Sequence, residues 1–179
     1  MSIKLPKTKI IILVVFFLFF ALPQSARAVF IGQQDKFSIE KEYDLSGRET
    51  LSAELLKIGS RLYYYADIAW WNTLSQLERS DVQLALENLD REFSQRMYPT
   101  LTSTFGSEWN PGIDGQIPIT MLLHVMKDEA GGYTNYGDEY PRVQVPNSNE
   151  REMIYLNVKA TRGPFLKSFL AHEFTHLVT

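Results

Sequence analysis

Apolar residues recur along residues 80–98 with the period of an α-helix. The stripe consists of side chains at steps of four, three, four and four: Val82, Leu86, Leu89, Phe93 and Met97. This spacing places them on one face of a long helix and leaves the charged residues between them in solvent. Ser80 is the expected N-cap, because its hydroxyl can accept a hydrogen bond from the first turn. Pro99 disfavours helical backbone at Tyr98 and predicts an interruption there.

Three apolar runs are typical of strands. Residues 60–71 are rich in aromatic side chains, residues 117–126 are aliphatic, and residues 152–158 form a shorter run. Aromatic enrichment and a continuous apolar run are both features of buried strands. The polar stretch 127–152 contains glycine, proline and asparagine, and loops of this length are commonly functional or mobile.

A second helix is predicted from Pro164 onward, since proline suits the first turn of a helix. Apolar side chains supply its buried sides: Phe165, Leu166, Phe169, Leu170 and Phe174. Residues 29–59 are weakly patterned by comparison. They contain either a short helix or the tail of a propeptide, and their role is left open.

The N-terminus is typical of a secretory signal peptide. Lys4, Lys7 and Lys9 precede an apolar run over residues 10–22, and small residues follow up to Ala28. A basic start, a short apolar run and an A-x-A ending predict cleavage after Ala28. The alternative is an uncleaved anchor, but a spanning helix needs ~20 apolar residues. We therefore expect residues 1–28 to be removed, and the mature protein to be secreted and to meet a membrane only during export.

Composition and charge exclude several classes of protein. The chain has 179 residues, of which 45% are hydrophobic and 22% charged, as in globular proteins. The net charge of −3 provides no basic field for nucleic acid. Cysteine is absent, which excludes disulfides and cysteine–zinc sites. Only three histidines occur, so two of them beside one glutamate are notable.

That glutamate lies in the segment HEFTH, which has the spacing of a zinc site. His172 and His176 are four positions apart, so a helix places both imidazoles on one face, where they can bind one Zn²⁺. Glu173 lies about 100° round the helix. From there it could accept a proton from zinc-bound water as the general base of a peptidase. The alternative is a helix that carries the pattern by chance.

A catalytic zinc site needs a third protein ligand. The longer pattern H-E-x-x-H-x-x-G-x-x-H would place glycine at Thr179, which argues against it. A glutamate from a later helix is another source, and it would lie beyond Thr179. We therefore expect the chain to be the N-terminal part of a larger enzyme. Upstream candidates are also present: His124, Asp138, Glu139, Glu150 and Glu152. Among these, His124 lies in an apolar run and is more typical of a core residue.

Four segments together resemble secreted bacterial zinc metallopeptidases of the hyicolysin and immune-inhibitor-A type. They are NPGIDG, GGYTNYGDEY, SNEREMIYLN and FLAHEFTHL, and they cover roughly the last seventy residues. The resemblance implies an α+β, zincin-like fold in which a mixed sheet packs on a long backing helix and an active-site helix. It implies zinc held by His172 and His176, Glu173 as catalytic base, and a third ligand, a glutamate, from a later part. Residues 60–179 would then be the N-terminal part of the catalytic domain.

The same resemblance points to a substrate-binding strand. In that fold the strand before the active-site helix usually borders the cleft, so Ile154, Tyr155 and Leu156 would pair with an extended peptide. The alternative is an ordinary interior strand. Oxygen-bearing side chains in the preceding loop make calcium a second candidate ion, although no EF-hand spacing is present. They are Asn135, Asp138, Glu139, Asn147, Asn149 and Glu150.

Two functional hypotheses follow for this chain. The first is a secreted zinc-dependent endopeptidase, a hydrolase that acts on a peptide or protein substrate. The second is an inactive exported zincin-like binding module that lacks a complete metal site. A third, a membrane-tethered structural protein, requires the N-terminal apolar run to stay attached. Neither the cleavage preference nor the oligomeric state follows from the sequence.

Overall fold

The computed structural model describes residues 29–179, and six strands in this part of the chain form one mixed sheet. They are β1 (Gln34–Ser38), β2 (Thr50–Ile58), β3 (Leu62–Asp67), β4 (Ile119–His124), β5 (Gly132–Tyr133) and β6 (Met153–Asn157). Their order across the sheet is β1-β2-β3-β4-β6-β5. The pairs β3–β4 and β4–β6 are parallel, and the other pairs are antiparallel. The α+β class expected from the sequence is confirmed.

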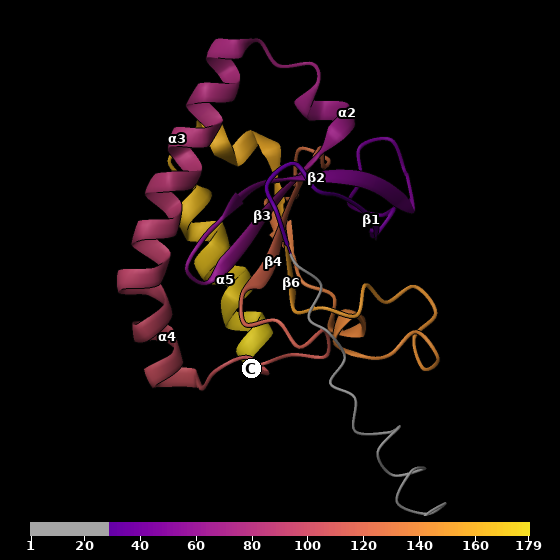
Figure 1. Cartoon of the computed structure of the whole chain (residues 1–179), viewed down its shortest axis with the longest axis vertical. Helices are drawn as coiled ribbons and strands as arrows, with labels where there is room; N and C mark the ends of the chain where they lie inside the picture. The colour runs from indigo at the N-terminus through magenta and orange to yellow at the C-terminus, as the bar shows by residue number, and fades with distance from the viewer. Residues whose placement is uncertain (1–28) are drawn as a thin grey trace, which may run out of the picture.

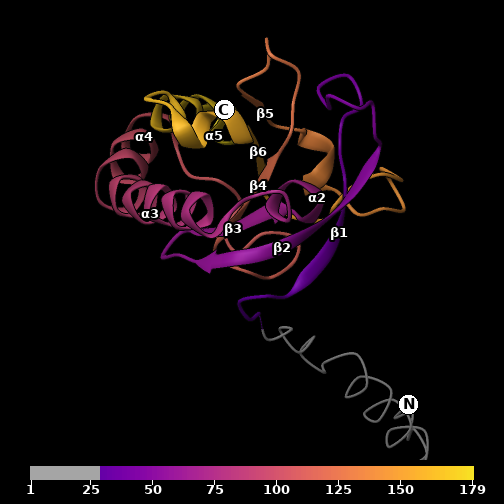
Figure 2. The same ribbon diagram turned by 90° about the horizontal axis from the view of Figure 1, so that it is seen from above.

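The long helices lie together on one side of this sheet (Figures 1 and 2). They are α3 (Gln76–Glu92), α4 (Tyr98–Phe105) and α5 (Leu166–Val178). Shorter helical pieces are α2 (Ile68–Trp71), η1 (Phe93–Met97), η2 (Tyr136–Glu139) and η3 (Val158–Arg162). None of the helices formed by residues 29–179 is long and apolar enough to cross a membrane.

Each face of the sheet has its own apolar core. Met121 and Leu123 of β4 join the cluster that includes α3 and α5. Leu122, between them, joins a second cluster on the opposite face, which includes Tyr133 and Tyr155. This division follows from the alternation of side chains along a strand. The second face is covered by loops rather than by the long helices.

The apolar stripe of the first helix is buried as expected, but the helix begins earlier. Ser75, not Ser80, is the N-cap of α3, and it forms a capping box with Glu78. The Ser75 hydroxyl accepts from the backbone N–H of Glu78 at 3.3 Å, and the Glu78 carboxylate accepts from that of Ser75 at 2.8 Å. These reciprocal bonds satisfy the backbone N–H groups of Ser75 and Glu78. With Ser80 as the N-cap, one turn later, these two groups would have no such partner.

The interruption expected at Tyr98 is a change of helical pitch rather than a break. Residues 93–97 form a π-helical turn in which the Tyr98 N–H donates to the Phe93 carbonyl, and α4 follows directly. Pro99 lies in the first turn of α4, directly after the π-helical turn. The helical column therefore continues past the proline, as Figure 1 shows.

Residues 29–59 provide two strands of the sheet. The short helix, one of the two alternatives for this region, is therefore a wrong prediction. Along β2 the side chains of Leu51, Ala53 and Leu55 are buried and alternate with more exposed ones. This period of two is a strand signal that a helical interpretation overlooks. The region is therefore part of the same sheet as residues 60–179. The signal peptide expected over residues 1–28 lies outside the described residues.

The run 60–71 and the loop 127–152 each contain an unexpected element. The strand β3 ends at Asp67, whose carboxylate accepts from the Ala69 N–H at 2.9 Å and starts α2. The loop 127–152 contains β5, a two-residue edge strand that pairs with Tyr155 and Leu156 of β6. Such a short strand has too few residues for a periodic pattern.

Candidate functional site

The helix α5 has a buried, mainly apolar side and an exposed side that carries two histidines. Leu170 and Phe174 are fully buried against the sheet and the neighbouring helices, and Phe174 meets Phe93 edge to face at 5.2 Å between ring centroids. His172 and His176 are exposed on the other side. Their Nε2 atoms lie 3.2 Å apart, and the ring planes are at 88°.

This separation fits two ligands of one zinc ion. Tetrahedral zinc with Zn–N bonds of about 2.0–2.1 Å holds its ligand atoms about 3.3 Å apart. A distance of 3.2 Å is also within reach of an N–H···N hydrogen bond between the two rings, which requires one protonated and one bare Nε2. The separation of the two nitrogens is therefore suitable for binding zinc, and a hydrogen bond between the rings can produce the same separation without zinc.

Glu173 is buried between α5 and the edge strand β5. A Cβ atom built on Gly132 would lie 3.0 Å from the Glu173 Cγ, and one on Gly131 would lie 2.5 Å from the Phe169 ring. The two glycines therefore allow β5 to lie directly on the helix. Burial raises the pKa of Glu173, and interactions with His172 and His176 oppose that rise. The sequence contains this Gly-Gly pair, but only the packing reveals its role.

No third ligand accompanies the pair within residues 29–179. In this part of the chain no group of three or more His, Cys, Asp or Glu side chains is arranged to hold a metal ion. None of the upstream candidates therefore forms a ligand group with His172 and His176: His124, Asp138, Glu139, Glu150 and Glu152.

Three of these candidates have other surroundings in the fold. His124 is buried at the end of β4, as expected for a core residue. The Glu150 carboxylate accepts from the Arg142 N–H at 2.9 Å. The Glu152 carboxylate lies against Gly112 and accepts from the Ile113 N–H at 3.3 Å. Burial raises the pKa of Glu152 to about 7.

Three of the loop residues considered for calcium, Asn135, Asp138 and Asn149, tie the loop to other parts of the fold. The Asp138 carboxylate accepts from the Tyr155 hydroxyl at 2.5 Å and from the Asn149 N–H at 2.7 Å. Asn149 in turn exchanges hydrogen bonds with the backbone of Ser38, and the Asn135 amide donates to Glu40 at 3.0 Å. Burial raises the pKa of Asp138 to about 6. These groups therefore bind one another and the sheet, and the calcium site stays a prediction.

The predicted substrate-binding strand is interior, not an edge. Ile154, Tyr155 and Leu156 are buried and lie in β6, which pairs with β4 on one side and with β5 on the other. An added peptide cannot pair with Tyr155 and Leu156 while β5 occupies that side of β6, and the role of Ile154, Tyr155 and Leu156 in substrate binding stays a prediction. The edge beside α5 belongs to β5.

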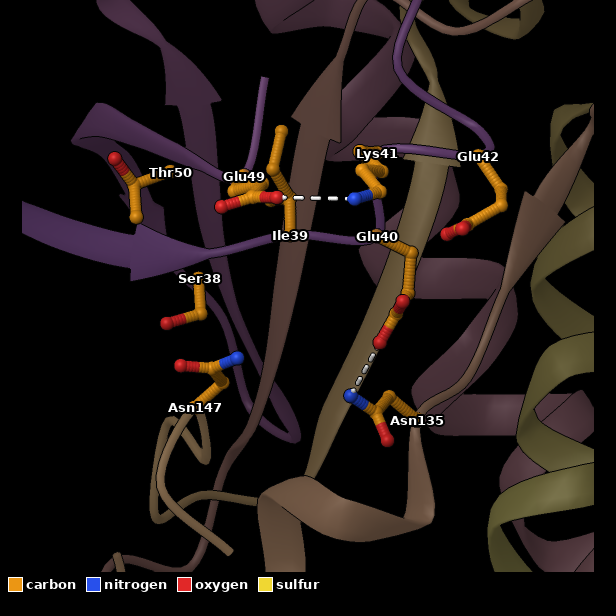
Figure 3. A pocket seen from close by; sticks show the side chains of 9 residues that line it. All are labelled: Ser38, Ile39, Glu40, Lys41, Glu42, Glu49, Thr50, Asn135 and Asn147. Atoms are coloured by element: carbon orange, nitrogen blue, oxygen red, sulfur yellow. Dashed lines mark hydrogen bonds and ion pairs between the residues drawn. The ribbon is translucent and has the colours of Figure 1, made fainter. Parts of the chain in front are cut away.

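Two cavities are each lined in part by a residue that lies close to β5 in the chain, Asn135 in one and Gly131 in the other. One, of about 270 Å³, is shown in Figure 3, where the dashed lines join Asn135 to Glu40 and Lys41 to Glu49. The other, of about 230 Å³, lies over the first turns of α5 and is lined in part by Gly131, Phe165 and Phe169. The sequence did not predict either cavity, because their walls come from segments far apart in the chain.

A comparison with protein-family models and with curated protein sequences finds no match to this chain. The candidate site therefore depends on its own residues and geometry: an exposed histidine pair, a buried glutamate between them in sequence, and an edge strand held against the same helix.

Proposed function

We propose that this chain carries the zinc-binding helix of a secreted zinc endopeptidase with a zincin-like arrangement of sheet and helices. The observation that carries the proposal is the 3.2 Å separation of the His172 and His176 Nε2 atoms on the exposed side of α5. The mixed sheet, with α3 and α5 packed on the same face, supports the arrangement.

The residues would divide the chemistry in a simple way. His172 and His176 would hold zinc, which when bound lowers the pKa of a water molecule and polarises a peptide carbonyl. Glu173 would accept the proton of the attacking water and pass it to the departing amine. Its packing against Gly132 fixes the carboxylate stem, so that little side-chain freedom is lost when it acts.

The substrate would lie along β5. This strand forms the end of the sheet beside α5, and an extended peptide can add to an edge strand by backbone pairing. Such a peptide would pass Gly132, and Gly132 touches Glu173. The edge and the general base would therefore meet at the same point of the cleft.

A second candidate function is an inactive exported binding module. It is favoured by one observation, the absence of a third ligand for the histidine pair among residues 29–179. Two histidines leave half of a tetrahedral shell to water, so this module would bind zinc weakly. The endopeptidase requires a third ligand from outside these residues.

The first experiment measures zinc content and hydrolysis of fluorescein-labelled casein by the protein purified from its native host. We expect about one zinc per molecule and proteolysis that a chelator removes. Glu173→Gln should keep the zinc and lower the rate by roughly 10²–10⁴-fold, the usual contribution of a general base. His172→Asn is the matched control and should lose zinc and activity together.

Two outcomes would contradict the proposal, the first the role of Glu173 and the second the endopeptidase itself. Undiminished hydrolysis by Glu173→Gln would mean that another group acts as the base. Weak zinc binding without proteolysis in the wild-type protein would favour the binding module.

A further inference from the structure

Asn157 is a buried asparagine whose side chain joins separate segments of the chain near α5. It is the last residue of β6 and has an exposed fraction of 3%. Its amide nitrogen donates to the carbonyls of Lys127 and Ala130, at 3.2 and 2.9 Å. Its Oδ1 accepts from the Lys159 N–H at 3.1 Å. Both donor hydrogens of the amide and its acceptor oxygen are therefore in use.

The backbone of Asn157 is bonded to the same region. Its N–H donates to the carbonyl of Gly131, the residue just before β5, at 3.0 Å. Within the turn 127–130, the Ala130 N–H donates to the Lys127 carbonyl at 3.1 Å. Asn157 therefore holds the turn by its side chain and the start of the edge strand by its backbone.

The bond between Asn157 and Gly131 also fixes which backbone groups of β5 are turned outward. In an antiparallel pair, residues that exchange hydrogen bonds with the neighbouring strand alternate with residues that do not. Gly131 is bonded to Asn157, and Gly132 lies opposite Leu156 one position further on. The N–H and C=O of Gly132 therefore point away from β6. On that side no further strand follows β5 within residues 29–179.

Gly132 lies where β5 contacts the candidate site. A Cβ atom built on it would lie 3.0 Å from the Glu173 Cγ, and one on Gly131 would lie 2.5 Å from the Phe169 ring. Figure 2 shows the strand beside α5. The position of Gly131 against the helix thus also sets how close the outward groups of Gly132 come to Glu173.

The other end of β5 is held without Asn157. The Tyr133 ring stacks on those of Tyr43 and Tyr155, at 4.7 and 4.3 Å between centroids. The Tyr133 hydroxyl accepts from the Glu40 N–H at 3.2 Å. Loss of the Asn157 side chain should therefore leave Tyr133 in place.

The turn before β5 has two further contacts, and neither involves Ala130 or Gly131. The Lys127 N–H donates to the Tyr43 carbonyl at 2.9 Å and fixes the beginning of the turn. Asp128 pairs with Lys159 at the surface, and exposed ion pairs contribute little to stability. The carbonyls of Ala130 and Gly131 are bound by Asn157. Its side chain is therefore the contact that fixes the end of the turn.

We propose that Asn157 is a positioning residue for the substrate: it holds Gly131 against α5, so that the outward N–H and C=O of Gly132 pair with an extended peptide beside Glu173. The proposal rests on the proposed function, because it concerns the same edge of the sheet. It also predicts where pairing ends. The N–H and the carbonyl of Ala130 are both bonded inside the protein, so backbone pairing of the peptide stops at Gly132 on that side.

The first test measures binding of fluorescein-labelled casein by fluorescence anisotropy, with Glu173→Gln as the background so that the probe stays intact. Adding Asn157→Ala should weaken binding by about tenfold, the loss expected when two backbone hydrogen bonds are displaced. In the protein that keeps Glu173, Asn157→Ala should raise KM by a similar factor and change kcat by less than about twofold. This pattern indicates lost substrate binding rather than lost chemistry.

Ser148→Ala is the matched control. The Ser148 hydroxyl is also buried, lies within hydrogen-bond distance of the carbonyls of Asp138 and Tyr140, and accepts from the Glu150 N–H. It therefore ties a turn of the same loop, but away from β5. Ser148→Ala should lower the thermal stability as Asn157→Ala does, and it should leave casein binding and KM unchanged.

A second measurement needs no variant of Asn157. Amide hydrogen exchange of the full chain carrying Glu173→Gln is followed by NMR with and without casein. We expect casein to slow the exchange of the Gly132 N–H, because this group gains a partner. The exchange of the Ala130 N–H, which already has one, should stay the same.

The outcomes separate this proposal from the endopeptidase. Unchanged casein binding in Asn157→Ala would overturn the role of Asn157, and so would a Gly132 N–H that casein leaves unprotected. If the wild-type protein does not hydrolyse casein but both effects are present, the endopeptidase fails and the role of Asn157 in peptide binding stands. If hydrolysis occurs and both effects are absent, the endopeptidase stands and the role of Asn157 fails.

Discussion

The histidines of this chain occupy two regions with opposite properties. On α5, His172 and His176 are exposed and lie 3.2 Å apart at Nε2, on a helix whose buried side is mainly apolar. At the end of β4, His124 is buried beside Asp44, which is paired with Arg48. The first arrangement leaves ring nitrogens open to a ligand from solvent, and the second closes them off. The role of a histidine here is decided by its access to water and by the partners already present, not by its residue type.

The largest expected effect tests whether only the exposed pair binds metal. His172→Asn should weaken zinc binding by more than about 100-fold, because it removes a direct ligand and even indirect partners of ligands contribute 10–100-fold. His124→Asn should leave zinc affinity unchanged. Isothermal titration of the apo protein with zinc measures both. Equal losses in the two variants would mean that the two regions are not separate.

The next effect concerns the polar group around His124. Arg48→Met should destabilise the fold by about 3 kcal/mol, because it leaves the buried carboxylates of Asp44 and Asp67 without their cation. Urea unfolding at pH 7.5 measures the change. Lys41→Met is the control, since Lys41 pairs with Glu49 at the surface, and it should unfold at the wild-type urea concentration. A small effect of Arg48→Met would show that the group is well hydrated.

The smallest effect concerns the contact between β5 and α5. Gly132→Ala should cost about 1–3 kcal/mol by overpacking, since its Cβ would lie 2.7 Å from the Tyr155 carbonyl oxygen and from the Leu156 side chain. Gly163→Ala is the matched control, because its Cβ meets nothing closer than 4.0 Å. Thermal unfolding compares the two. If both variants behave alike, β5 does not depend on glycine to lie against the helix.

The helical stripe and the aliphatic run were predicted correctly from residues that are neighbours in sequence. The stripe Val82, Leu86, Leu89 and Phe93 is buried along α3 and η1, and the aliphatic run 117–126 contains β4. The spacing of His172 and His176 placed both side chains on one face of α5. In each case the helical or strand period is a local property of the backbone, so a few consecutive residues determine it.

What the sequence left open depends on residues far apart in the chain. Whether β6 is an edge or an interior strand is decided by β5. The contact between His124 and Asp44 joins residues that are 80 positions apart in the chain. The sequence by itself determined the periodic elements and the histidine pair, because their geometry is local. Only the tertiary structure decided which edge is free and which polar groups are buried, because pairing and burial arise from contacts that no short segment contains.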